Sequence, residues 1–328
     1  MDVMSEQHTP SYVEQGEEFT RDVTYIDDRI TRDARVPEHG PTEGRMWPVE
    51  PGRYRLIAAK ACPWATRTLI VRQLLGLEDV ISVGLPGPTH DARSWTFDLD
   101  EGGVDPVLDI HFLRDAYNAR FTDYPRGITV PAIVDTAEGP TKGAVVTNDF
   151  PWITHDLFFE WREHHRADAP DLWPAGLRAE MEEVMKRVYT EVNNGVYRCG
   201  FAGSQEAYDA AYDRLWTALD WLEDRLGERR YLMGEALTEA DVRLWTTLAR
   251  FDAVYHGHFK CNRQKLIELP NLWGYARDLY QSFPAFRDNT DFDQIKAHYY
   301  VVHGDINPSH IVPKGPDLSV WDEPHGRG

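Results

Sequence analysis

Residues 54–85 read YRLIAAKACPWATRTLIVRQLLGLEDVISVGL, and this stretch decides the fold. The apolar runs at residues 54–59 and 80–85 are typical of buried strands. Residues 66–75, between the two runs, are expected to be helical. Pro63 suits the first position of this helix, and Gly76 suits its C-cap. A strand, a helix and a second strand in this order predict a parallel pair with a right-handed crossover.

The segment after this unit continues to alternate. A helix is expected over residues 106–121, and strands are expected over residues 128–134 and 144–147, joined by turn residues as a hairpin. A trans proline inside a strand would interrupt its hydrogen bonds. The strand therefore begins at Pro131, or the bond between Val130 and Pro131 is cis.

Beyond residue 150 the pattern becomes helical. One helix face is marked by apolar side chains spaced three or four residues apart, namely Tyr208, Ala211, Leu215, Leu219, Leu222 and Leu226. Thr238 and Asp241 form a capping box that opens another helix. Further helices are expected over residues 176–193, 271–282 and 291–302. The predicted fold class is α/β followed by all-α, that is, a small mixed-sheet domain and a helical domain.

The length of 328 residues suits two domains. We expect the mixed-sheet domain over residues 51–160 and the helical domain over residues 170–302. Residues 1–50 are polar and rich in charge and proline, so an irregular or partly disordered arm is expected there. Residues 303–328 are rich in proline and glycine and should form an extended tail.

The composition is that of a globular protein with a strong negative charge. Hydrophobic residues make up 42% and charged residues 27%. With 35 basic and 54 acidic residues the net charge is −19, which repels phosphate backbones and anionic lipids. Nucleic acid and membranes are therefore not expected partners. The sequence has no apolar run of about 18 residues and no signal-peptide pattern, so a soluble, cytoplasmic protein is expected.

The three cysteines, Cys62, Cys199 and Cys261, are widely spaced and odd in number, which favours a reducing compartment over a disulfide framework. Cys62 directly precedes a helix, whose unpaired N–H groups and positive end stabilise a thiolate. The alternative is a small buried hydrophobe, the usual role of a free cysteine. Because Ala65 stands where a CxxC motif has its second cysteine, a mixed disulfide at Cys62 would need an external thiol to resolve it.

The turn Ala61-Cys62-Pro63-Trp64-Ala65 resembles the active-site turn of the glutathionyl-hydroquinone reductases, the Xi class of glutathione transferases. The resemblance covers roughly residues 50–328. Its further motifs include Ser94-Trp95-Thr96-Phe97, Thr129-Val130-Pro131, Val192-Asn193-Asn194-Gly195-Val196-Tyr197, Leu237-Thr238-Glu239-Ala240-Asp241 and His298-Tyr299-Tyr300. It implies a thioredoxin-like N-terminal domain, a helical glutathione-transferase C-terminal domain and, usually, a homodimer.

The resemblance also implies a reaction, in which a glutathionyl-hydroquinone and a second glutathione give hydroquinone and glutathione disulfide. Cys62 would attack the thioether sulfur, expel the hydroquinone and form a mixed disulfide that the second thiol reduces. Tyr197, Tyr255 and Tyr299 match tyrosines that donate hydrogen bonds to the leaving aromatic group. Each of them is also compatible with an ordinary half-buried core position.

The resemblance assigns further residues to the thiol co-substrate. The backbone of Val130, ahead of Pro131, would pair with its cysteinyl part, and Trp95 would pack over it. Asp149 would lie at the helix start that holds the γ-glutamyl end. Trp95 is equally typical of a residue that anchors a loop.

Three departures from the family pattern are present. Asp149-Phe150 replaces Glu-Ser, Gly127 stands where the family has an arginine, with Arg126 displaced by one position, and Thr66 replaces a histidine. The first two weaken recognition of the γ-glutamyl carboxylate. The co-substrate is therefore expected to be either glutathione, bound poorly, or another low-molecular-weight thiol such as mycothiol.

Three functions remain open on these grounds. The leading one is a thiol-dependent reductase of glutathionyl- or mycothiolyl-hydroquinones acting through Cys62. The second is a general thioltransferase or dehydroascorbate-type reductase, and the third is a non-catalytic glutathione-transferase-like binding protein. No metal is expected, because His256-Gly257-His258 with Cys261 matches no standard zinc spacing.

Overall fold

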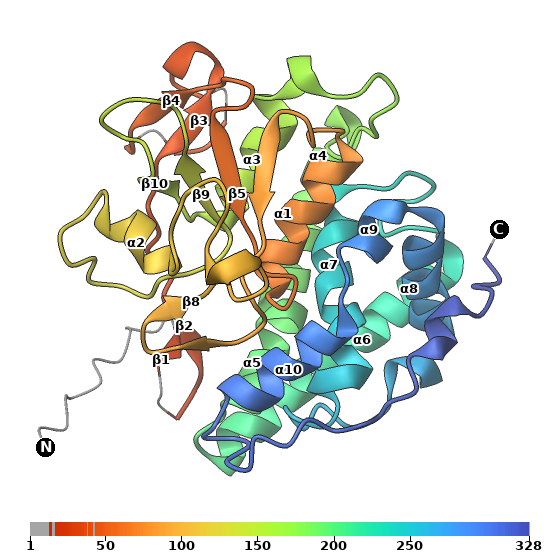
Figure 1. The fold of residues 1–328 in the computed structure, drawn as a ribbon. Helices are drawn as coiled ribbons and strands as arrows, with labels where there is room; N and C mark the ends of the chain where they lie inside the picture. The colour runs from red at the N-terminus through yellow and green to blue at the C-terminus, as the bar shows by residue number, and fades with distance from the viewer. Residues whose placement is uncertain (1–12, 15–16, 38, 42, 328) are drawn as a thin grey trace, which may run out of the picture. The chain divides into compact units, whose positions relative to one another are not determined.

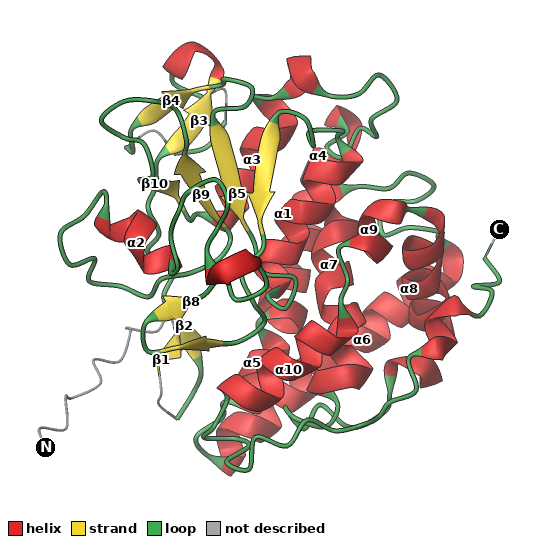
Figure 2. Cartoon of the chain, viewed as in Figure 1, coloured by secondary structure: helices red, strands yellow, loops and turns green. Residues whose placement is uncertain are grey.

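The computed structural model describes residues 13–14, 17–37, 39–41 and 43–327, which divide into two compact units. The first unit contains Arg21–Ala167, and the second contains Val13–Thr20 and Asp168–Gly328. Figure 1 follows the chain through both units, and Figure 2 shows the four-stranded sheet in the first unit and mainly helices in the second.

The first unit is built on a mixed sheet with the strand order β10-β9-β5-β6. Strands β5 (Tyr54–Ile57) and β6 (Ile81–Gly84) are parallel and are joined by helix α1 (Pro63–Leu74). Strand β9 (Ala132–Asp135) is antiparallel both to β5 and to β10 (Val145–Thr147). The predicted parallel pair, the crossover helix and the hairpin are thus confirmed, together with the thioredoxin-like sheet.

The centre of the sheet explains why residues 54–59 carry so few polar side chains. All four residues of β5 are buried, as expected for a strand with neighbours on both sides. Its one charged residue, Arg55, donates to Asp105 Oδ2 from two nitrogens, at 2.9 and 2.8 Å, so the buried charge is paired. Helix α1 packs against α3 (Phe150–Phe159) and is buried along nearly its whole length.

The helix expected over residues 106–121 is wrong for most of that range, because α2 covers only Leu113–Asn118. The Oδ1 atom of Asp105 accepts hydrogen bonds from the N–H groups of Val107 and Leu108, at 3.0 and 2.9 Å, and holds that segment in a turn. Asp109 has a positive φ of 56°, which a helix does not allow.

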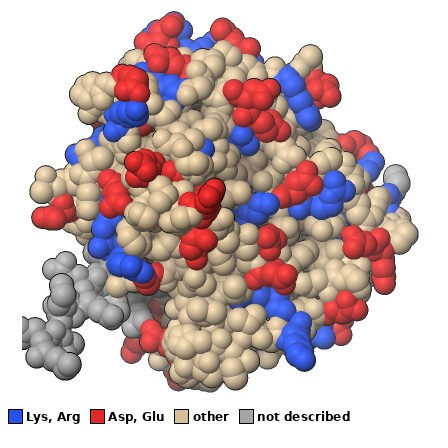
Figure 3. Space-filling model, viewed as in Figure 1, with Lys and Arg blue, Asp and Glu red and all other residues tan. Residues whose placement is uncertain are grey.

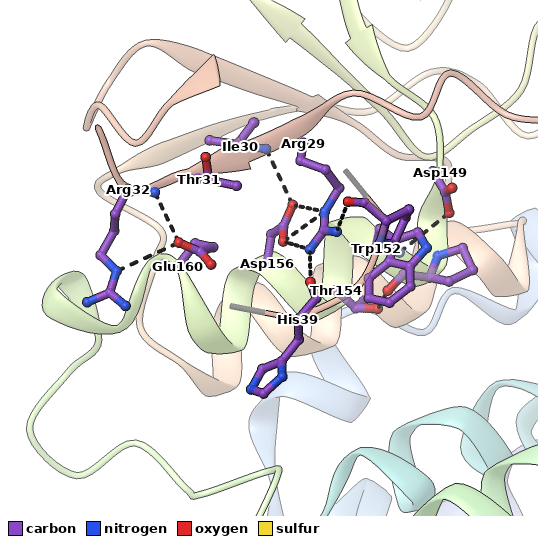
Figure 4. Close-up of polar contacts among 12 residues, drawn as sticks. Arg29, Ile30, Thr31, Arg32, His39, Asp149, Trp152, Thr154, Asp156 and Glu160 are labelled. Carbon is purple, nitrogen blue, oxygen red and sulfur yellow. Dashed lines mark hydrogen bonds and ion pairs between the residues drawn. The ribbon is translucent and has the colours of Figure 1, made fainter. Parts of the chain in front are cut away.

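Part of the segment expected as an irregular arm is regular and packed. Strand β3 (Arg29–Thr31) pairs in parallel with β4 (Met46–Pro48), and Trp47 of β4 is buried. Arg29 forms a bidentate ion pair with Asp156 on α3, as Figure 4 shows. The expectation of an irregular segment is therefore wrong for these strands, while its first 12 residues lie outside the described ones.

The second unit is helical, apart from its short N-terminal segment. Its longer helices are α4 (Arg178–Arg187), α6 (Gln205–Glu228), α7 (Glu239–Arg250), α8 (Pro270–Ser282) and α10 (Phe292–Val302). Its shorter ones are the π-helical turns Val188–Asn193 and Phe251–Tyr255, α5 (Gly195–Gly200) and α9 (Pro284–Asp288). The capping box of Thr238 and Asp241 is present. Within the described ranges no helix is long and apolar enough to cross a membrane.

The C-terminal tail is largely extended and is anchored near its end. Trp321, in the 3-10 turn Ser319–Asp322, is buried, with its ring centroid 4.8 Å from that of Trp273 and 5.5 Å from that of Trp245. Arg327 donates to main-chain carbonyls at the end of α6, including that of Arg229 at 2.6 Å. The tail therefore contributes to the core of the second unit.

Candidate active site

Cys62 lies where β5 leads into α1. Its own N–H donates to the carbonyl of Ala59 at 3.0 Å, and its extended backbone (φ −81°, ψ 124°) places it at the N-cap of the helix. Pro63 occupies the first helical turn, as predicted. The first-turn N–H groups of a helix have no acceptors within the helix, so a sulfur at this position lies at the positive end of the helix dipole.

The Cys62 thiol faces the loop before β9. Its Sγ atom donates to the carbonyl of Val130 at 3.6 Å, and 9% of the cysteine is exposed. The bond between Val130 and Pro131 is cis, which confirms that alternative, and β9 begins one residue after the proline, at Ala132. The structure therefore brings Cys62, Val130 and Pro131 together.

The loop carrying Val130 is held by two side chains from elsewhere in the first unit. The Tyr117 hydroxyl donates to the carbonyl of Thr129 at 2.9 Å, and the Asn148 amide donates to the Thr129 hydroxyl at 2.8 Å. The hydroxyl of Thr66, one of the three departures from the pattern of the resemblance, donates to the carbonyl of Cys62 at 2.9 Å. The Thr66 side chain is therefore bonded to the backbone of the first turn of α1.

Asp149 is the N-cap of α3, where its carboxylate accepts the N–H of Trp152 at 3.5 Å (Figure 4). Burial raises the pKa of Asp149 to about 6, against the opposing effect of that N–H group. The next residue, Phe150, has its ring centroid 4.7 Å from that of Trp64. The first turns of α1 and α3 therefore lie side by side, and Asp149 belongs to the same region as Cys62.

The other two residues expected at the co-substrate have different surroundings. Trp95 lies in the short strand β8 (Ser94–Trp95), buried, with its ring 4.9 Å from that of His90. Ser94 has φ 122°, a strained conformation of the kind that occurs at functional sites. Arg126 forms an ion pair with Asp22.

Sequence reasoning missed one charged residue of this region. The guanidinium of Arg21 lies over the ring of Trp64, with its carbon 4.9 Å from the centroid. No signal in the sequence links the two, because they are far apart in the chain and Arg21 belongs to the segment expected to be irregular.

The three tyrosines meet in the second unit. Tyr299 of α10 is central, with its hydroxyl 2.6 Å from that of Tyr197 on α5 and 2.8 Å from that of Tyr255 in the π-helical turn. We call Tyr197, Tyr299 and Tyr255 the phenol chain. Tyr300, the neighbour of Tyr299, packs instead on the ring of His258.

Burial differs along the phenol chain. Tyr255 is fully buried, Tyr299 is 1% exposed and Tyr197 is 8% exposed. Burial holds the pKa values of Tyr255 and Tyr299 well above the usual range, so both are neutral donors at physiological pH. Tyr197 therefore stands at the more accessible end of the chain.

Aromatic rings surround the phenol chain. Phe19 and Phe201 stack on Tyr197, with ring centroids at 5.8 and 6.2 Å. His303 packs against Phe201 at 5.1 Å, and its Nδ1 lies 3.2 Å from Nε2 of His258. The Tyr197 end of the phenol chain is therefore packed among aromatic rings.

The remaining cysteines are buried in the second unit. Cys199 and Cys261 are 2% and 0% exposed, and burial holds the pKa of the Cys261 thiol well above its usual range. Their environment fits the structural role expected for them. Among the residues that the structure describes, no group of three or more His, Cys, Asp or Glu side chains could hold a metal ion.

The charged groups on the face seen in Figure 3 are mixed, with acidic and basic side chains interspersed. Together with the net charge of −19, this pattern is unlike the continuous basic surface of proteins that bind nucleic acids.

Two family models match the chain. Residues 61–157 match "Glutathione S-transferase, N-terminal domain", and residues 205–278 match "Glutathione S-transferase, C-terminal domain". The first match spans Cys62, Val130 and Asp149, and the second spans Tyr255.

Relatives match over nearly the whole chain. "Glutathionyl-hydroquinone reductase YqjG" of Escherichia coli is 40% identical over 314 residues, covering 95% of this chain and 93% of its own. Its glutathione-bound structure has a TM-score of 0.83, covering 91% of this chain and 94% of that one at 41% identity.

Two further solved structures are similar. A glutathione transferase from Gordonia bronchialis is 67% identical, with a TM-score of 0.86 and coverage of 92% of this chain and 90% of that one. The Xi glutathione transferase from Phanerochaete chrysosporium is 40% identical, with a TM-score of 0.80 and coverage of 89% and 96%.

Proposed function

This chain belongs to the glutathionyl-hydroquinone reductases, the Xi class of glutathione transferases, and from that premise we propose that it reduces thiol conjugates of hydroquinones through Cys62. The observation that carries the proposal is the position of Cys62 at the N-cap of α1. A nucleophilic thiolate is favoured there by the helix dipole.

In the first step the Cys62 thiolate attacks the sulfur of the conjugate. A sulfur–sulfur bond forms and the bond between that sulfur and the aromatic carbon breaks. The electron pair remains with the quinol, which takes up a proton and leaves as the hydroquinone. The conjugate is thereby reduced, and Cys62 is left in a mixed disulfide.

In the second step another low-molecular-weight thiol attacks the mixed disulfide, releases a soluble disulfide and restores the Cys62 thiolate. An external thiol is required, because the residue at the CxxC position is Ala65 and the other two cysteines are buried in the second unit. The backbone of Val130 and the carboxylate of Asp149 would bind this thiol, with Trp95 and Arg126 as further contacts.

The phenol chain would act on the leaving group. Tyr197, at its more accessible end, would donate to the quinol oxygen on which charge develops. The Tyr299 hydroxyl lies next to the Tyr197 hydroxyl and can support that donor directly, whereas the Tyr255 hydroxyl pairs with that of Tyr299 and its ring lies 6.1 Å from that of Tyr197. We therefore assign Tyr255 a positioning role.

The co-substrate is proposed to be glutathione or mycothiol. A relative has been solved with glutathione bound, which supports glutathione. The replacement of the family's Glu-Ser pair by Asp149-Phe150 favours mycothiol, because it removes a hydroxyl group that would bind the γ-glutamyl carboxylate.

The test is turnover with a glutathionyl-hydroquinone and a mycothiolyl-hydroquinone, each with its own thiol, compared between the wild type and Cys62→Ala. Cys199→Ala is the matched control, because it removes a buried thiol of the second unit. We expect hydroquinone release by the wild type and the control and none by Cys62→Ala. Equal rates for all three proteins on both conjugates would refute the proposal.

Turnover of a mixed-disulfide substrate, measured in parallel, distinguishes this function from that of a general thioltransferase.

We also propose a homodimer from the family resemblance. Light scattering should then give a mass near twice the chain's 37.8 kDa.

A further inference from the structure

The turn after α7 and the end of α10 are joined at two places. Tyr255 of the turn pairs with Tyr299 of α10 through their hydroxyl groups, at 2.8 Å. Further along both segments, Nε2 of His258 lies 3.2 Å from Nδ1 of His303. Residues four apart on a helix lie on the same face, so Tyr299 and His303 both face this turn. The imidazole pair therefore repeats, about one helical turn away, the link that the two tyrosines make.

Phe259 packs against both links. Its ring is fully buried and stacks on that of Tyr255, with centroids 5.4 Å apart, and on that of His303, at 5.7 Å. A side-chain carbon at Gly200 would overlap the Phe259 ring, so α5, which also carries Tyr197, approaches this ring as closely as a glycine allows. Because a packed interior transmits small displacements, a shift of His303 would reach α5 through Phe259.

The backbone of the turn is strained just after these residues. Lys260 has a φ of 59°, which is uncommon for a residue with a side chain. The Tyr208 hydroxyl donates to the carbonyl of Lys260 at 2.7 Å, and the N–H of Cys261 donates to the carbonyl of Tyr255 at 3.1 Å. Such a conformation persists where surrounding contacts impose it, and it often occurs at functional sites.

The end of α10 takes its backbone partners from the tail that follows it. The N–H groups of Ile306 and Asn307 donate to the carbonyl of His303, at 3.1 and 2.9 Å, and the Asn307 amide donates to the carbonyl of Tyr300 at 2.6 Å. These bonds satisfy the carbonyl groups that a helix end leaves without partners. The bond between His303 and His258 differs, because it ties the helix end to a segment distant in sequence.

The protonation of His258 makes this bond directional. His258 is 6% exposed, and burial lowers its pKa to about 4, with a further contribution from the charge of Lys260. Its ring is therefore neutral at physiological pH and has one N–H donor and one acceptor nitrogen. In the pair with His303, one nitrogen donates and the other accepts.

We propose that His258 and His303 are positioning residues, whose hydrogen bond holds α10 so that the Tyr299 hydroxyl meets that of Tyr197. Both act through Tyr299, and neither is assigned a contact with the substrate. This inference rests on the proposed function, because it concerns the tyrosines that we assign to the leaving quinol.

The first experiment compares kcat and KM for a hydroquinone conjugate between the wild type, His303→Phe and His303→Asn. Phenylalanine keeps an aromatic ring but has no nitrogen, whereas asparagine keeps a polar amide near the position of Nδ1 but has no ring. We expect kcat of His303→Phe to fall about fivefold, equivalent to about 1 kcal/mol, with KM unchanged. His303→Asn should retain most of the wild-type kcat.

Two results would overturn the inference while leaving the function intact. If His303 served only in packing, His303→Phe would be the faster of the two variants. An unchanged kcat in His303→Phe, measured where Tyr197→Phe is slow, would also exclude positioning through the imidazole pair. Absence of turnover by the wild type would instead contradict the proposed function.

A double-mutant cycle tests the pair as a unit. His258→Phe and the double variant with His303→Phe are measured in the same assay. Since either change breaks the same bond, the double variant should be no slower than the slower single variant. Losses that multiply would show that the two histidines act separately and would overturn the inference. His256→Asn, in the same turn, is the matched control and should keep the wild-type kcat.

A further measurement uses only the wild-type protein, in case the variants do not fold. Nitrogen-15 NMR of the histidine side chains near pH 7 should show one proton shared unequally between Nε2 of His258 and Nδ1 of His303, with one nitrogen protonated and the other not. Rapid exchange of tautomers at both rings would show that the bond is absent and would overturn the inference.

Discussion

The thiol region of the first unit and the phenol chain of the second prepare their reactive groups in opposite ways. Cys62 lies at a helix start, where the backbone of a short stretch of chain favours the charged form. Tyr255 and Tyr299 lie in the core, where burial favours the neutral form. The proposed nucleophile needs negative charge and the proposed hydrogen-bond donors need their protons, so each environment suits the role that we propose for it.

The comparison also shows where each group gets its partners. Cys62 owes its position to the next residues of the chain and to one loop, at Val130. The phenol chain combines three elements that are distant in sequence, α5, the π-helical turn after α7, and α10. Substitutions should therefore act locally in the first region and through a network in the second.

The largest expected effect is the difference in alkylation rate between the thiols of Cys62 and Cys261. Cys62 should react with iodoacetamide at pH 7 about 10³ times faster than Cys261, because the helix start favours the thiolate of the former and burial disfavours that of the latter. Peptide mass spectrometry of the folded protein after timed alkylation measures both rates. Comparable rates would remove the basis for Cys62 as the nucleophile.

The next effect should come from Tyr197→Phe. Loss of the donor closest to the surface should lower kcat about 100-fold, the usual cost of removing one donor to a developing charge. The alkylation rate of Cys62 should not change, and neither should the melting temperature by more than a few degrees. An unaltered kcat would exclude Tyr197 from the reaction.

A smaller effect is expected of Tyr255→Phe. It removes a hydrogen bond to Tyr299 and leaves the Tyr197–Tyr299 contact in place, so kcat should fall about tenfold with KM unchanged. The pH profile of kcat distinguishes positioning from loss of packing, because only the former alters it. If Tyr255→Phe were as damaging as Tyr197→Phe, the order along the phenol chain would be wrong.

The smallest effect concerns Asp149 and pH. Its pKa of about 6 lies above the unfolded value of 3.8, so between pH 6 and 4 the folded state binds more protons than the unfolded state. This group therefore stabilises the fold increasingly as pH falls through that window. In Asp149→Asn that contribution, on the order of 1–2 kcal/mol, is absent.

Urea unfolding of both proteins between pH 4 and 7 measures this difference. As pH falls, the free energy of unfolding of the wild type should rise relative to that of Asp149→Asn. The asparagine still caps the helix, so the cap itself is retained. Parallel curves for the two proteins would show that Asp149 titrates normally.

Much of the fold could be predicted from the sequence. The run at residues 54–59, the helix after Pro63 and the capping box at Thr238 all depend on near neighbours in the chain, and all were found as expected. The helix predicted over residues 106–112 is absent because of a local turn that is held in place by a distant residue. Asp105 forms a turn with the residues that follow and is itself held by Arg55 of the central strand.

The candidate site was predictable in part. Cys62, Val130 and Pro131 form one group because a cysteine at a helix start and a cis proline before a strand both leave local signals. The contacts of Arg21 with Trp64 and of Tyr25 with Phe150 left none, because each joins the N-terminal segment to residues far along the chain.

The amino-acid order was sufficient for the fold class and for the position of Cys62 at a helix start, because backbone preferences and helix dipoles act within a few residues. The three tyrosines came from the family resemblance. Folding in three dimensions added the order Tyr197–Tyr299–Tyr255 and their unequal burial. It also brought the rings of Trp64 and Tyr25 into contact with Phe150. These features depend on side chains from separate elements meeting in a dry interior, and no local preference encodes such a meeting.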